Sequence, residues 1–121
     1  MKKIILALCA VGCMGQTIHA GSIENYAQSF ETISENYQKD LRQFLKGLDP
    51  QLVKFTPEQE QKFCGLVTEY VDDVYDAAVL NKDALEKAGK KVSKWQVIFD
   101  IMERKEMQIL AERYDVECPI D

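Results

Sequence analysis

The amino-acid sequence predicts an all-α protein, a small up-down-up three-helix bundle stapled by one disulfide, with one short helical turn before the last helix. Three observations predict this fold. Apolar residues recur every three or four positions in three long segments, which is the spacing of one helix face. Each segment starts at a residue able to cap a helix, namely Ser22, Thr56 or Ser93. Two cysteines, Cys64 and Cys118, remain once the amino-terminal segment is set aside.

That amino-terminal segment, residues 1–20, has the layout of a secretory signal peptide. Two lysines precede a compact apolar stretch, and small and polar residues follow it up to Ala20. Cleavage after Ala20 would leave one helical domain, residues 21–121, in the periplasm or outside the cell. Lipidation at Cys13 is a second interpretation, since a small-residue run precedes that cysteine. No other apolar run is long enough to span a membrane.

Export also determines how the four cysteines are interpreted. Cys9 and Cys13 lie inside the signal peptide, so Cys64 and Cys118 are left as each other's partners. In an oxidising compartment such a pair is expected to form a disulfide. The alternative, two free thiols with a redox role, lacks a Cys-x-x-Cys pair and an activating neighbour.

The charge of the exported chain is acidic. Removal of Lys2 and Lys3 reduces the 15 basic residues to 13, against 20 acidic ones, which leaves a net charge of −7. Nucleic acid and anionic membrane surfaces are therefore not expected as partners. A protein partner with a basic surface is compatible with this charge.

The first predicted helix runs from Ser22 to Leu48, with Ser22 as its cap and Asp49-Pro50 ending it. A continuous face of this kind could pack on the rest of the bundle or form a homodimer through the Ile23–Leu48 helix. The apolar face consists of Ile23, Tyr26, Phe30, Ile33, Tyr37, Leu41, Phe44, Leu45 and Leu48.

The second predicted helix, residues 56–80, opens on Thr56-Pro57-Glu58-Gln59, which has the spacing of a capping box. Gly65 is unusual in a helix interior. Its position beside Cys64 suggests the hypothesis that another segment, such as the carboxyl-terminal tail, approaches closely there. After a break with about one helical turn, ended by Gly89, we expect a last helix from Ser93 to about Arg113. We expect Trp95 to lie in the core at its start.

Few residues in the chain are suited to catalysis. The one histidine, His19, lies in the signal peptide, so the exported protein has no imidazole for nucleophilic catalysis or for zinc. The sequence contains no glycine-rich phosphate loop and no cysteine cluster with zinc spacing. We therefore expect a protein that is not an enzyme and carries no cofactor or metal.

One acidic stripe is the candidate site for a partner. Glu69, Asp72, Asp73 and Asp76 fall at helical spacing, roughly opposite the apolar face of the second helix. Such a stripe is commonly a solvated face. Its functional interpretation is a docking surface for a cationic partner, since calcium usually takes its ligands from a tight loop.

Together these features predict a small exported helical protein that acts by protein-protein binding in the bacterial envelope, of the inhibitor, immunity or adaptor type. A second prediction is a periplasmic carrier of a small apolar ligand, with a pocket lined by residues such as Phe30, Tyr70 and Phe99. A structural homo-oligomer is the third.

Overall fold

The computed structural model describes residues 21–120, and all regular secondary structure within that range is helical. The predictions for the signal peptide, for cleavage after Ala20 and for lipidation at Cys13 lie outside the described residues. Within the described part of the chain, no helix combines the length and the apolar character that crossing a membrane requires.

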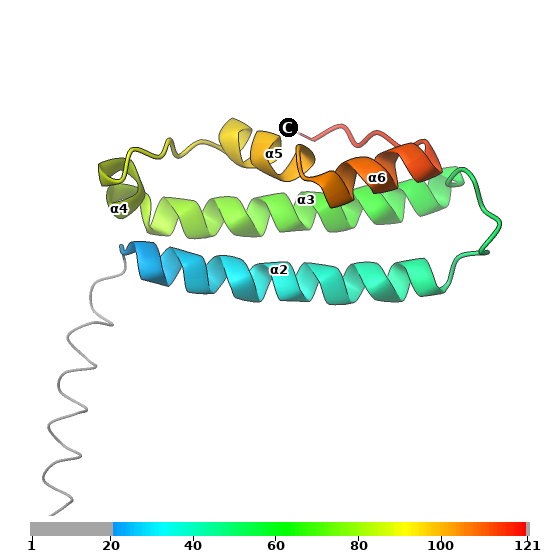
Figure 1. Ribbon diagram of the computed structural model, residues 1–121, viewed down its shortest axis with the longest axis horizontal. Coiled ribbons are helices and arrows are strands. Elements are labelled where there is room, and N and C mark those ends of the chain that lie inside the picture. Colours follow the sequence, from blue (N-terminus) through cyan, green and yellow to red (C-terminus); the bar gives the residue numbers. More distant parts are fainter. Residues whose placement is uncertain (1–20, 121) are drawn as a thin grey trace, which may run out of the picture.

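Two long helices form an antiparallel hairpin (Figure 1): α2, Ile23–Lys46, and α3, Pro57–Leu80. The predicted caps are present at both starts. The Ser22 side chain accepts a hydrogen bond from the Asn25 backbone N–H at 2.9 Å. At α3 both bonds of the capping box form, because Thr56 Oγ1 accepts from the Gln59 N–H and Gln59 Oε1 accepts from the Thr56 N–H.

The short helix α4, Lys82–Lys87, follows α3 almost without interruption and corresponds to the predicted single turn. Gly89 ends this segment with a φ of +82°. That backbone conformation suits glycine because the Cβ atom of any other residue would lie too close to the following carbonyl oxygen.

The prediction of one continuous last helix is wrong, because the structure has two helices in that segment. α5 spans Lys94–Met102, α6 spans Lys105–Tyr114, and Arg104 between them has an extended backbone. A continuous helix would carry the apolar face from Ile101 to positions 104, 105 and 108, which are all polar. The break shifts the phase of the helix, so that Met107 and Tyr114 are buried instead.

The path of the chain is nevertheless up-down-up, as predicted. Figure 1 shows α3 between α2 on one side and the α5–α6 pair on the other. α3 contributes most of the core, and its buried side chains include Phe63, Val67 and Val71. By contrast, α2 contains no fully buried residue among its 24 positions, because it covers α3 from one side with a half-exposed apolar face.

The carboxyl-terminal tail is attached to α3 by the predicted disulfide. Cys64 and Cys118 are bonded, with their Cα atoms 5.3 Å apart. The close-approach hypothesis for the neighbouring Gly65 is wrong, because a Cβ added there would meet nothing within 4 Å. Gly65 lies on the exposed side of α3, while the tail packs along the side on which Cys64 lies.

A cluster of aromatic rings holds together the end of the bundle where α3 begins and α6 ends. Phe55, from the connector between α2 and α3, is 4 % exposed and stacks on Tyr114 with ring centroids 4.4 Å apart. Its backbone N–H also donates to the Tyr114 carbonyl. Phe44 and Phe63 complete the cluster from α2 and α3. A connector residue thus belongs to the core, which the sequence pattern did not indicate.

Candidate functional site

The acidic stripe is on the outer side of α3, as its spacing predicted. Glu69, Asp73 and Asp76 are exposed there and Asp72 is half-buried. Asp72 differs from the others because its carboxylate pairs with Lys94 Nζ at 3.0 Å, at the start of α5. The other three carboxylates make no ion pair with any residue in 21–120. In that same range, acidic and cysteine side chains form no group suited to holding a metal ion.

An exposed aromatic pair on α5 is a feature that the sequence analysis missed. Trp95, expected in the core, is 71 % exposed, and Phe99 is 48 % exposed. They are four residues apart and therefore lie on the same side of the helix. The core face of α5 is made by Val97, Ile98 and Ile101 instead.

The number of apolar residues in α5 could have indicated that this helix has an exposed apolar face. This helix has more large apolar side chains than one buried face accommodates, so some of them must be exposed. The ion pair between Lys94 and Asp72 joins the start of α5, where Trp95 is the next residue along the chain, to the acidic stripe of α3. Glu69, Asp73 and Asp76 line hollows that residues of α2 also line, so Asp72 is the member of the stripe that connects it to α5.

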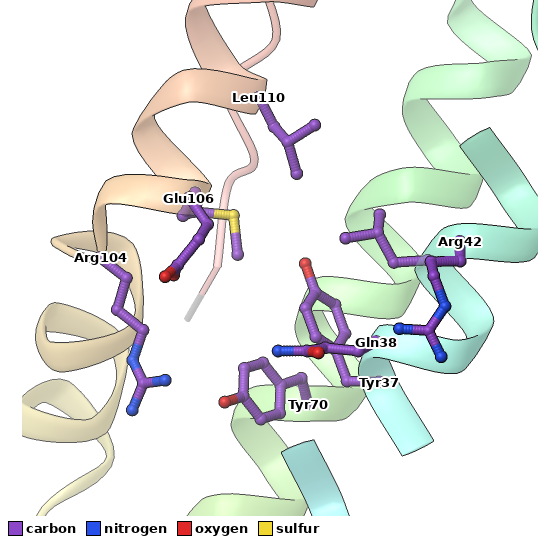
Figure 2. A pocket seen from close by; sticks show the side chains of 9 residues that line it. Tyr37, Gln38, Arg42, Tyr70, Arg104, Glu106 and Leu110 are labelled. Carbon is purple, nitrogen blue, oxygen red and sulfur yellow. The ribbon is translucent and has the colours of Figure 1, made fainter. Parts of the chain in front are cut away.

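Of the three residues expected to line a ligand pocket, Phe30 and Tyr70 lie together, with ring centroids 6.5 Å apart, but Phe99 does not join them. Phe99 faces outward, and Phe30 lines a hollow of about 140 Å³ against α5, together with Tyr26 and Val97. Tyr70 lines a different and larger pocket of about 250 Å³ between α2 and α6. Figure 2 shows this pocket, which we call the α2–α6 pocket.

The α2–α6 pocket has apolar surfaces and a charged rim. Figure 2 shows Arg104 and Glu106 on one wall, Gln38 and Arg42 on the opposite wall, and two tyrosine rings between them. Leu41, Met107 and Leu110 supply the aliphatic surface.

The two tyrosines are stacked, with the centroids of Tyr37 and Tyr70 4.4 Å apart and the ring planes 8° from parallel. The Tyr70 hydroxyl is hydrogen-bonded to Ser34 Oγ at 2.9 Å. The Tyr37 hydroxyl is buried and has no hydrogen-bond partner within residues 21–120. Burial raises the pKa of Tyr37 to about 12, and nearby Tyr70 and Glu106 act in the same direction. This phenol is therefore a neutral donor, buried without an acceptor.

Comparison with protein-family models, with curated proteins and with solved structures found no match to this chain. The exposed surfaces of α3 and α5 and the α2–α6 pocket are therefore the candidate sites of this protein.

Proposed function

We propose that this protein acts by binding another protein, through a surface composed of the exposed aromatic pair of α5 and the acidic stripe of α3. The observation that carries the proposal is the 71 % exposure of Trp95, with Phe99 48 % exposed on the same side of the helix. Tryptophan is enriched among the residues that dominate binding energy in protein interfaces. Exposure of a large aromatic side chain to water is energetically unfavourable. Burial of that side chain in a partner's pocket would therefore stabilise the complex.

The chemistry of the partner follows from the charges of the acidic stripe. Glu69, Asp73 and Asp76 are acidic and unpaired within the described part of the chain. A complementary surface has an apolar pocket for Trp95 with lysine or arginine side chains beside it. The acidic residues would mainly accelerate and orient the encounter, while the aromatic pair would supply most of the affinity. An inhibitor, an immunity protein and an adaptor all require a contact of this kind.

The proposed place of action is the bacterial envelope or the medium. A disulfide between Cys64 and Cys118 fits an oxidising compartment. The proposal includes export directed by residues 1–20, with cleavage near Ala20. The homodimer through the Ile23–Leu48 helix stays a prediction, since a single chain does not test it. The apolar face of α2 is occupied here by packing on α3.

The test compares capture from an envelope extract by three forms of the tagged protein. The wild type and an Ile109→Ala control, which removes a 56 % exposed apolar side chain from α6, are expected to retain the same partner. A Trp95→Ala/Phe99→Ala variant is expected to lose it. If the double variant captures that partner as well as the wild type does, the α5 surface is not the contact.

Tryptophan fluorescence gives a second readout, because Trp95 is the only tryptophan in the sequence. Its emission is expected to shift to shorter wavelength when the purified captured partner is added, as the ring leaves water. A separate Glu69→Gln/Asp73→Asn/Asp76→Asn variant should slow association and weaken the salt dependence of binding. An unchanged association rate in that variant would exclude the acidic stripe from the contact.

A further inference from the structure

The α2–α6 pocket combines one buried hydroxyl that lacks an acceptor with two exposed arginines that form no ion pair within residues 21–120. Arg104 is held above the Phe30 ring, with its guanidinium carbon 4.9 Å from the ring centroid, and makes no ion pair with residues 21–120. Arg42 on the opposite wall likewise has no ion-pair partner in that range. Arg104 and Arg42 are exposed at the rim, where water can solvate them. The Tyr37 hydroxyl is buried, and because buried donors are rarely left unpaired, this group requires an explanation.

Apart from Gln38 and Glu106, the remaining pocket surface is apolar. Leu41, Met107 and Leu110 line it together with the two tyrosine rings. A volume of about 250 Å³ is slightly below the range usual for drug-sized ligands, roughly 300–1,000 Å³. An occupant that satisfies both parts of the pocket is therefore small, has an aliphatic or aryl body, and ends in a group that accepts hydrogen bonds.

We propose that the α2–α6 pocket binds a small amphipathic monocarboxylate. Its carboxylate pairs with Arg104 and accepts from the Tyr37 hydroxyl, and its apolar body lies along Leu41, Met107 and Leu110. The position of Arg104 suits this role because stacking on Phe30 restricts the guanidinium before the ligand arrives. Arg42 adds positive charge at the opposite rim.

Glu106 is the one acidic residue among those that line the pocket, and it lies on the same wall as Arg104. Its negative charge would repel the carboxylate of a ligand. Substitutions of Glu106 and of Arg104 should therefore change ligand affinity in opposite directions. Loss of the Arg104 charge should weaken binding, whereas loss of the Glu106 charge should strengthen it. A purely apolar ligand would be nearly insensitive to both changes.

The experiment uses the exported protein with its disulfide formed and two probes, octanoate and the neutral 1-octanol, in calorimetric titrations. Octanoate is expected to bind with a Kd below about 1 mM and at least about fivefold more tightly than 1-octanol. Arg104→Gln should reduce octanoate affinity by about fivefold or more and leave 1-octanol unchanged. Glu106→Gln should increase octanoate affinity by about twofold.

Arg113→Gln is the matched control, because Arg113 is also stacked on an aromatic ring, that of Tyr114, but lies outside the pocket. It should leave octanoate affinity unchanged. Backbone amide NMR shifts on octanoate addition should be confined to residues 37–42, residue 70 and residues 104–110. The proposal does not depend on the α5 surface, because neither Trp95 nor Phe99 lines the pocket.

Three results would overturn the proposal. The first is the absence of saturable octanoate binding up to about 10 mM. The second is equal binding of octanoate and 1-octanol that Arg104→Gln does not change. The third is a set of NMR shifts centred on Trp95, which would indicate nonspecific adsorption to the exposed aromatic pair. Circular dichroism establishes that each variant is folded before it is titrated.

Discussion

The side-chain oxygen of Asn81 accepts a hydrogen bond from the backbone N–H of Ser22 at 3.0 Å, and so ties the end of α3 to the start of α2. The same oxygen accepts from the Asn25 side chain at 3.1 Å, and the Asn81 amide donates to the Ala77 carbonyl at 2.8 Å. Asn81 is the one fully buried polar side chain in residues 21–120. Asn81 therefore fixes how the start of α2 packs against the end of α3.

Replacement of Asn81 by Leu is expected to reduce the free energy of unfolding by about 3 kcal/mol. The change removes the buried acceptor that the Ser22 backbone N–H and the Asn25 side chain share. Urea denaturation measures the effect. Asn36→Leu, at an exposed position on α2, is the control and should change stability by less than about 0.5 kcal/mol. Equal effects at the two positions would show that the buried network contributes little.

Replacement of Gly65 by Ala is expected to stabilise the protein by about 1 kcal/mol. Alanine restricts the unfolded chain and favours the helix, and its Cβ would meet nothing within 4 Å in α3. The melting temperature should therefore rise. Gly89→Ala is the contrasting variant, because at a φ of +82° the methyl group is strained and the melting temperature should fall. A lower melting temperature for Gly65→Ala would mean that another segment does pack there.

Removal of the disulfide is expected to cost about 4 kcal/mol of stability in the chain-entropy model. The bond closes a long loop, since Cys64 and Cys118 are 54 positions apart. The Cys64→Ala/Cys118→Ala variant and the reduced wild type should both unfold at lower urea concentration. Amide exchange at Val116, which is buried beside the bond, should accelerate with them. Unchanged exchange at Val116 would show that the tail stays docked without the covalent link.

Tyr37→Phe should have opposite effects on stability and on ligand binding. Removing a buried hydroxyl that has no partner is expected to raise the free energy of unfolding by about 1 kcal/mol at neutral pH. The same change should weaken octanoate binding severalfold, because the carboxylate loses a donor. Denaturation and calorimetry on one preparation measure both effects. A stability gain with unchanged octanoate affinity would remove Tyr37 from the proposed site.

The pH dependence of wild-type stability follows from the raised pKa of Tyr37, about 12 in the folded protein against 10.0 for a free tyrosine. Folding favours the neutral phenol, so its contribution is complete below pH 10 and is lost as the pH rises toward 12. The stability of the wild type should therefore fall more steeply between pH 10 and 12 than that of Tyr37→Phe. Parallel curves for the two proteins would contradict this assignment.

Local patterns in the sequence were sufficient for the fold class and for most helix ends. The caps at Ser22, Thr56 and Ser93 depend on hydrogen bonds between residues three apart, so a linear sequence contains all the information they need. The disulfide could be inferred because only two cysteines remain after the predicted signal peptide is set aside. The outward position of the acidic stripe followed from helical periodicity.

Other features depended on which face of each helix found a partner, and only the tertiary structure decided them. A helical pattern shows that α5 is apolar on several sides, but the packing of Ile98 and Ile101 on α3 determines that Trp95 is left in water. The break at Arg104 arises because the second half of the segment must bury Met107 and Tyr114. The α2–α6 pocket results from that break and from the incomplete burial of α2. These are relations between residues far apart in the chain, and periodicity within one segment carries no information about them.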